Sequence, residues 1–257
     1  MKLDTEKIEN SSKAAQKFTE LFKGKDQNLC DSAYFIFNNF YGRLTSGFDN
    51  YRFKDTTVKY DSLLTDSNRK YLSKLSGNLA YYAQKLKDNG LRVYMSEGDT
   101  CIGQDLDFFA KWFYDDISPT MKEYLIQLNK DDKEGYAEDA GLTISPYQLA
   151  DRTVWWEKFA SKHPNCIVSD NSENNWKDYL GTILQGMDNS PVIDYDEIHN
   201  GQKSLNDYYK LAYGYIQASY PNTETNKLVS PYFKLLLQKD SNKADKLLKE
   251  YKKDGKI

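Results

Sequence analysis

The sequence predicts an all-α protein of stacked helical hairpins, interrupted by a minor β-hairpin or extended excursion near residues 91–104. Three observations favour this fold class. Apolar residues recur at helical spacing along most of the chain. Two Ser-Pro pairs have the form of helix starts, an N-cap followed by proline in the first turn. Two aromatic-rich segments, WWEKFASKHPN at 155–165 and YGYIQASYPN at 213–222, end in the same way.

The composition is that of a folded protein with an unusual share of aromatic residues. The chain has 257 residues, enough for one large domain or two modest ones, and 39% are hydrophobic. Its 21 Tyr, 12 Phe and 4 Trp supply much of the apolar volume. A net charge of −3 gives no basic field, so we expect no nucleic-acid partner. No run is apolar enough to predict a transmembrane segment.

The N-terminal residues and the cysteines leave the compartment open. MKLDTEKIENSSK is polar and has no apolar core of a secretion signal. The chain is therefore either cytoplasmic, or a mature exported chain to which Met1 was added after its signal was removed. Cys30, Cys101 and Cys166 lie far apart without a CxxC pair, and an odd count leaves at least one thiol unpaired. We interpret them as reduced or buried structural thiols.

Helices dominate the predicted N-terminal part, residues 1–128. The expected helices are 14–22, 32–44, 66–86, 107–116 and the segment after Ser118-Pro119. Asn89-Gly90 is a typical end for the third of them. Next comes LRVYMSEGDTCIGQD at 91–105, whose β-branched and aromatic residues flank a Glu97-Gly98-Asp99 turn. The polar segment 129–143 is predicted to be a boundary or an exposed loop.

The predicted C-terminal part, residues 144–257, begins with a helix at 146–162 that is apolar on two sides. Such a helix must lie between neighbours. The two sides are Leu149, Trp156, Phe159 and Ala160 on one, and Tyr147, Ala150 and Val154 on the other. Later helices are expected around 176–187, 205–216, 227–239 and 244–253. We expect this part to pack with the first as one continuous domain.

The two similar stops explain how the C-terminal helices are connected. Phe159 lies five residues before Pro164, and Ile216 lies five residues before Pro221. In both places proline prevents the helix from continuing, and a second helix follows a short polar link. The sequence therefore predicts the same helix–turn–helix unit twice. Such units bury their apolar faces by stacking.

The segment YPNTETNKLVSPYF at 220–233 resembles the inter-helix turn of tetratricopeptide-like repeats. The resemblance is to versions found in bacterial envelope lipoproteins, where a Tyr-Pro-Asn or Tyr-Pro-Ser turn joins paired helices. It covers residues 146–253, and His163-Pro164-Asn165 is a poorer copy. The 34-residue period of these repeats is not visible. The resemblance implies export to the periplasm or cell surface of a Gram-negative bacterium, with a lipid anchor. It supplies no catalytic residues.

The absence of catalytic motifs favours a non-enzymatic binding or scaffold protein. The sequence has no GxGxxG, GxxxxGK[ST], HExxH, GxSxG or EF-hand pattern, and we expect no cofactor. Stacked helices rich in aromatics would present an aromatic-lined groove to a protein or peptide partner. Trp155 projects toward the side that carries Arg152, so these two residues are the candidate partner contacts. Packing between helices is the alternative role of Trp155.

Three acidic segments offer other chemistry. Glu97 and Asp99 lie in the predicted turn and are the candidate carboxylates of an alternative function, a hydrolase acting on glycans. The segment DYDEIH is a weak metal-site candidate, and the ligands of the metal would be Asp194, Asp196, Glu197 and His199. The alternative is that Asp194 or Asp196 caps the next helix. A third acidic stretch is interpreted as a solvated loop; its members are Asp131, Asp132, Glu134, Glu138 and Asp139.

Overall fold

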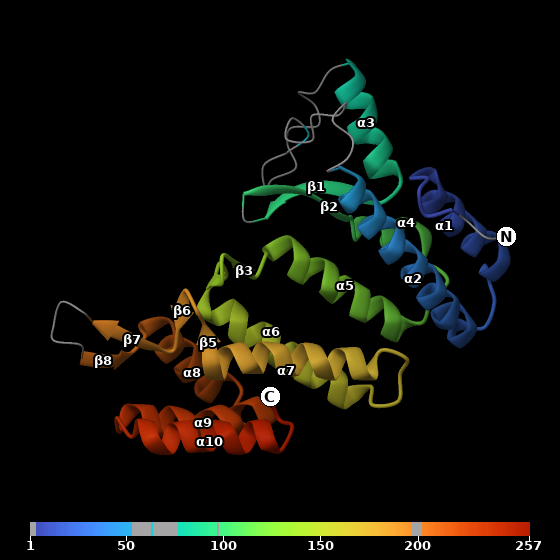
Figure 1. The fold of residues 1–257 in the computed structure, drawn as a ribbon. Helices are drawn as coiled ribbons and strands as arrows, with labels where there is room; N and C mark the ends of the chain where they lie inside the picture. Colours follow the sequence, from blue (N-terminus) through green and yellow to red (C-terminus); the bar gives the residue numbers. More distant parts are fainter. Residues whose placement is uncertain (1–3, 53–62, 64–76, 97, 197–201) are drawn as a thin grey trace. The chain divides into compact units, whose positions relative to one another are not determined.

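The computed structural model describes residues 4–52, 63, 77–96, 98–196 and 202–257. These residues form ten helices and four two-stranded antiparallel sheets, which confirms the predicted helical class (Figure 1). The chain divides into two compact units, Met1–Asn129 and Lys130–Ile257, so the division falls inside helix α5. No helix in these ranges is long and apolar enough to cross a membrane.

The described residues of the first unit form five helices and one hairpin. Its elements are α1 (Glu9–Phe22), α2 (Gln27–Arg52), α3 (Gly77–Asp88), β1 (Leu91–Ser96), β2 (Asp99–Gln104), α4 (Asp107–Trp112) and most of α5 (Pro119–Glu134). α1 and α2 extend beyond the predicted bounds through residues that are also buried, among them Ser11, Cys30 and Thr45. Of the predicted helix 66–86, residues 66–76 lie outside the described residues. The rest is α3, which ends just before Asn89-Gly90 as predicted.

Aromatic side chains form the core of this unit. Phe113 is fully buried, with its ring centroid 4.7 Å from that of Phe18 on α1 and 4.6 Å from that of Phe37 on α2. Other rings extend the cluster along α2 and α4; they belong to Tyr34, Tyr41, Phe108 and Phe109. Such contacts add to the apolar burial that each ring supplies. The cluster joins α1, α2 and α4 into one body.

The predicted hairpin at 91–104 is confirmed, and Gly90 sets its start. β1 pairs with β2 from Leu91 opposite Gln104 to Ser96 opposite Asp99. Gly90 has φ +77° after α3, and its carbonyl accepts a hydrogen bond from the Tyr41 hydroxyl. A Cβ on Gly90 would lie 2.6 Å from that hydroxyl and 2.7 Å from the Phe108 ring. Glycine is therefore required by both the backbone conformation and the packing.

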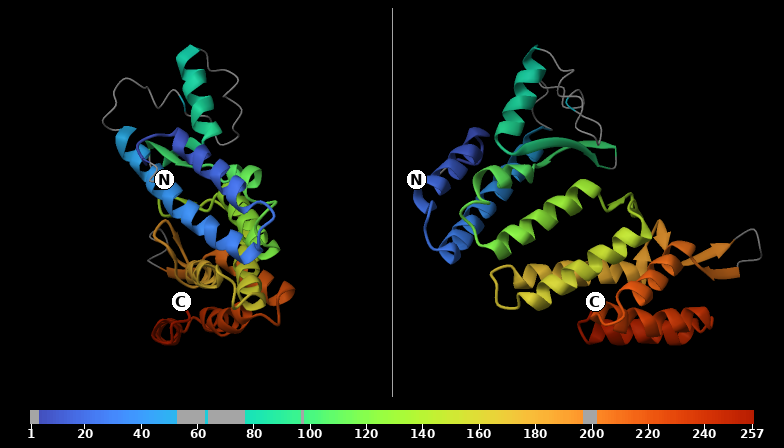
Figure 2. Two further views of the ribbon diagram at one scale, coloured as in Figure 1. Left: turned by 90° about the vertical axis from the view of Figure 1, so that its right-hand side faces the viewer. Right: turned by 180° about the vertical axis from the view of Figure 1, so that it is seen from behind.

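The second unit contains three hairpins of short strands between helices that pack on one another (Figures 1 and 2). After the end of α5 it has β3 (Ala137–Glu138), β4 (Gly141–Leu142), α6 (Pro146–Lys162), α7 (Ser169–Gln185), β5 (Gly186–Met187), β6 (Ser190–Pro191), β7 (Ile193–Asp196), β8 (Gln202–Leu205), α8 (Asp207–Ser219), α9 (Glu224–Leu237) and α10 (Ser241–Lys253). The hairpins at 137–142 and 186–205 were not predicted. Strands of two to four residues leave too little alternation in a sequence to be recognised.

Helix α6 lies between neighbours, as its two apolar sides predict. It packs against α7, α8 and α9, and Leu149, Ala150 and Trp156 are all fully buried. Its start is fixed by the predicted Ser145 N-cap, which forms a reciprocal capping box with Gln148. The prediction for Tyr147 was wrong: its side chain is 46% exposed, because it lies in the first turn at the end of the helix.

The two aromatic-to-proline stops have the same backbone geometry. His163, which ends α6, has φ −126° and ψ 54°, and its N–H donates to the Phe159 carbonyl. Tyr220, which ends α8, has φ −133° and ψ 47°, and its N–H donates to the Ile216 carbonyl. Proline excludes the helical conformation from the residue before it, so both chains leave the helix in the same way. α7 follows the first stop and α9 follows the second.

Buried polar groups join these helices to one another. The carboxylate of Glu157 on α6 accepts the N–H groups of Glu224 and Thr225 at 2.7 and 2.8 Å, at the start of α9. A carboxylate there also interacts favourably with the helix dipole. Tyrosine hydroxyls donate to backbone carbonyls in the same unit: Tyr208 to Ile144, Tyr209 to Ser190, Tyr213 to Ile183 and Tyr251 to Leu228. Tyrosine is thus used as an apolar ring with one satisfied donor.

The fit at Gly90 can be tested by Gly90→Ala with Gly24→Ala as its control. Both glycines have positive φ, but nothing lies within 4 Å of a Cβ on Gly24. We expect Gly24→Ala to lower the free energy of unfolding by about 1–2 kcal/mol from the backbone alone. Gly90→Ala should lower it by about 1–3 kcal/mol more, because Phe108 and Tyr41 must move. Urea denaturation followed by circular dichroism measures both, and equal losses would contradict the close contact.

The buried tyrosines predict a loss of stability in alkali. Burial raises the pKa of Tyr179 and of Tyr232 to about 12, and holds that of Tyr213 well above its usual range. A tyrosine in the unfolded chain has a pKa of about 10. The folded state therefore keeps protons that the unfolded state loses, and stability falls as the pH rises from about 10 to about 12. Part of the tyrosinate absorbance should therefore appear only together with unfolding. Ionisation of every tyrosine while the protein is still folded would contradict the burial.

Candidate functional site

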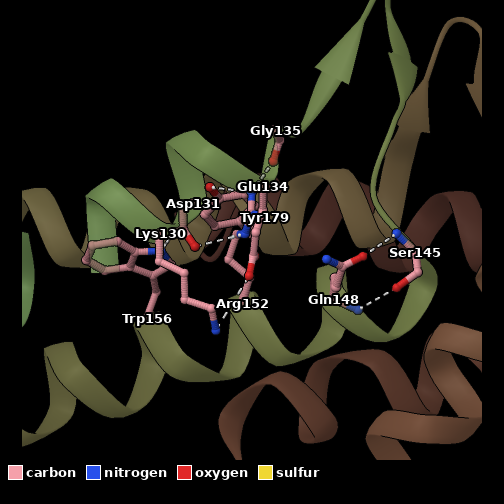
Figure 3. Close-up of polar contacts among 9 residues, drawn as sticks. All are labelled: Lys130, Asp131, Glu134, Gly135, Ser145, Gln148, Arg152, Trp156 and Tyr179. Carbon is pink, nitrogen blue, oxygen red and sulfur yellow. Dashed lines mark hydrogen bonds and ion pairs between the residues drawn. The ribbon is translucent and has the colours of Figure 1, made fainter. Parts of the chain in front are cut away.

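Arg152 lies inside the second unit, where its guanidinium is held by the end of α5 (Figure 3). Its side chain is 3% exposed, its Nε lies 3.0 Å from an Asp131 carboxylate oxygen, and its Nη2 lies 3.1 Å from Glu134. Nη1 donates to the Gly135 carbonyl at 2.9 Å. Burial is the largest single effect and opposes the charge, but Asp131, Tyr179 and Glu134 together outweigh it, and the pKa of Arg152 is raised. The predicted partner contact is therefore part of the interior.

The acidic stretch 131–139 is a solvated loop only in part, because Glu138 and Asp139 are exposed but Asp131 is buried. α5 continues to Glu134, and the helix turns Asp131 toward Arg152. The second carboxylate oxygen of Asp131 accepts the indole N–H of Trp156 at 2.9 Å. Asp131 is itself buried, so this is a buried ion pair in which the second carboxylate oxygen also has a partner. Its role is to join α5 to α6 within the second unit.

Trp155, the other predicted partner contact, is half-buried. Its ring stacks on Phe159 with centroids 5.2 Å apart and meets the edge of Trp156 at 4.8 Å. These contacts fit the alternative role of Trp155 in packing. A partner-binding role for this residue stays a prediction.

The residues of the two alternative functions are described only in part, so both functions stay predictions. Asp99 is exposed at the start of β2, and Glu97 lies outside the described residues. Asp194 and Asp196 lie in strand β7. The next helix, α8, is capped by Asn206, so the predicted capping role of Asp194 or Asp196 is wrong. Glu197 and His199 also lie outside the described residues. Within the described ranges, no group of three His, Cys, Asp or Glu side chains is placed to hold a metal ion.

A polar cleft of about 570 Å³ lies where α6 ends beside the turn between α8 and α9. Its wall includes Lys158 and Lys162, four residues apart on α6. The Lys158 ammonium lies 5.0 Å from the centre of the Tyr220 ring. The first two amides of α9, which would attract an anion, are already bonded to Glu157. The cleft is therefore a surface feature of the turn without a prepared anion site.

An apolar groove of about 380 Å³ lies between α1 and α2 in the first unit, and we call it the α1/α2 groove. Five described residues of each helix line it: Ala14, Lys17, Phe18, Leu21 and Phe22 of α1, and Ala33, Ile36, Phe37, Phe40 and Arg43 of α2. Phe18 and Phe37 are buried and held by Phe113 beneath them. Leu21 and Ile36 are 54% and 74% exposed. A groove with an ordered aromatic floor and open apolar walls is a typical binding surface for a helix.

The α1/α2 groove exists because α2 is apolar over a wide arc. Tyr34, Phe37 and Tyr41 form its buried stripe. Leu29, Ile36 and Phe40 form a second stripe, rotated by about 100° around the helix. Leu29 and Ile36 are exposed and Phe40 is half-buried, so this second stripe is left open by the described residues. The sequence signal was present, since residues 29, 33, 36, 40 and 43 recur at helical spacing.

Comparison with known proteins found no matching family, no matching characterised protein and no matching solved structure.

The buried ion pair can be tested by a double-mutant cycle with Arg152→Met and Asp131→Leu. Each single substitution leaves the other charge buried and should lower the free energy of unfolding by about 3–5 kcal/mol. The double variant removes both charges and should lose clearly less than the sum, with a coupling of at least about 1 kcal/mol. Lys243→Met breaks the exposed pair with Asp240 and should change stability little. Additive losses in the cycle would show that Arg152 and Asp131 act independently.

Proposed function

We propose that this chain is a non-enzymatic binding protein, and that the α1/α2 groove receives a helix of a protein or peptide partner. The observation that carries the proposal is the open second stripe of α2, with Ile36 at 74% exposure. Contiguous exposed apolar patches are typical of interaction sites. The groove thus takes the binding role that the sequence suggested for Arg152, which is buried.

The shape of the α1/α2 groove favours a helix as the occupant. Its walls are two packed helices whose lining residues follow 3–4 spacing, from Ala14 to Phe22 and from Ala33 to Arg43. Side chains at this spacing form ridges and grooves that another helix can fill. The lined length is about 12–15 Å, or two to three turns of an occupant helix. Its floor is already ordered by Phe113, so binding orders few groove side chains and costs little entropy.

We also propose that the C-terminal unit is a pair of tetratricopeptide-like hairpins, α6/α7 and α8/α9, which act as scaffold. The matching backbone at His163 and Tyr220 supports two copies of one turn. The packing of α6 on α8 and α9 supports stacking of the pairs. In this arrangement the buried Arg152 and Glu157 fix the helices, and neither side chain is a contact for a partner.

The binding role predicts that the α1/α2 groove selects peptides. A displayed library of random peptides about 15 residues long, enough for a helix that fills the groove, is selected on the full chain. Enriched peptides should lose binding on Leu21→Asp and keep it on Leu237→Asp. The two leucines are equally suited to comparison, because they are 54% and 57% exposed and each lies in the last turn of a 14-residue helix.

Loss of more than about tenfold in affinity on Leu21→Asp alone is the expected result, since burying a charge in an apolar groove costs more than 1.4 kcal/mol. Circular dichroism confirms that both variants fold. If the two leucine variants bind the selected peptides equally, or if selection enriches no peptide, the groove is not a binding site.

A further inference from the structure

We infer that the helix received by the α1/α2 groove carries acidic residues beside its apolar stripe; this inference rests on the function proposed above. The charges on the groove walls point to it. Lys17 of α1 and Arg43 of α2 place one cation on each wall, and the described lining residues include no carboxylate. A partner with carboxylates at the margins of its stripe would pair with both walls.

Lys17 is available for such a pairing. Its ammonium lies 2.8 Å from a carboxylate oxygen of Glu20, one turn along the same helix. The side chains of Lys17 and Glu20 are 59% and 50% exposed. Exposed pairs of this kind contribute little to stability, so exchanging Glu20 for a carboxylate of the partner costs little. Arg43 offers a planar guanidinium that can hold a carboxylate with two hydrogen bonds.

A second copy of this chain fits the α1/α2 groove less well than an acidic helix does. In a symmetric contact each copy presents the same surface, so two grooves would bring together two Lys17 and two Arg43 side chains. The groove supplies no lining carboxylate to compensate them, and like charges at an interface oppose binding. The partner is therefore a helix whose charge is opposite to that of the groove walls.

The helix that binds the α1/α2 groove must meet two requirements in its amino-acid sequence. The apolar stripe must recur at i, i+3 or i+4, and i+7, to contact Phe18, Ile36 and Phe40 along the groove. Glu or Asp must flank that stripe on both sides, facing Lys17 and Arg43. The first requirement belongs to the proposed function. The second is the new one.

Selection of peptides on two proteins tests the charge requirement. One selection uses the wild-type chain and the other uses the doubly reversed variant Lys17→Glu, Arg43→Glu. Peptides whose binding depends on Leu21 should carry acidic flanks on the wild type and basic flanks on the variant. A control variant, Lys249→Glu on α10, removes a cation from the other unit and should select the same acidic flanks as the wild type.

Affinities of individual peptides give the magnitude. Replacing the flanking Glu residues of a selected peptide by Gln should weaken binding roughly fivefold, the effect of two exposed ion pairs, and added salt should reduce that difference. Sedimentation of the free chain shows whether it self-associates.

The outcomes separate the two proposals. Groove-dependent peptides with the same flanks on both proteins would overturn the acidic partner and leave the binding function standing. Absence of any groove-dependent peptide would overturn both. A dimer that Leu21→Asp dissociates and Leu237→Asp does not would make the groove a contact between copies, and would also overturn the acidic partner.

Discussion

A helix with apolar side chains around much of its circumference must have neighbours on every side where those side chains lie, and this constraint governs both units. α6 satisfies it beyond its first turn, because α7, α8 and α9 pack against it and bury Leu149, Ala150 and Trp156. α2 satisfies it along Tyr34, Phe37 and Tyr41, where the aromatic cluster with Phe113 closes over it. Along Ile36 and Phe40 the described residues leave it open. The difference between these two helices is the basis of the proposed function.

Several buried polar groups in the second unit find their hydrogen-bond partners within that unit. Asp131 pairs with Arg152 and accepts from Trp156, and Glu157 occupies the amides at the start of α9. The hydroxyls of Tyr208, Tyr209 and Tyr213 each reach a backbone carbonyl. Groups that are so well satisfied internally have little to offer a ligand. Function is therefore better sought where large apolar side chains are left exposed beside a groove, as they are around Ile36 and Leu21.

Local rules predicted the helices and their ends, whereas side-chain roles depended on distant partners. Ser145 with Gln148, and the prolines after His163 and Tyr220, act within a few residues, so their effects could be recognised in the sequence. Asp131 looked like a solvated loop residue because nothing nearby in the sequence identifies Arg152 as its partner. The apolar residues of the second stripe of α2 recur at helical spacing, so the stripe could be recognised in the sequence. The sequence alone could not say which of the two stripes of α2 would be covered by α1 and Phe113. The short strands between α7 and α8 gave no periodic signal.

The central claim is that the second stripe of α2 faces water in the free chain and is covered by a partner. The most direct measurement is the rate at which a soluble maleimide labels Ile36→Cys in a chain with Cys101 and Cys166 changed to serine; buried Cys30 serves as the unreactive reference. The account predicts labelling at the rate of an unfolded-chain thiol, and strong protection once a selected peptide is bound. Slow labelling of the free chain would show that the stripe is already covered and would contradict the claim.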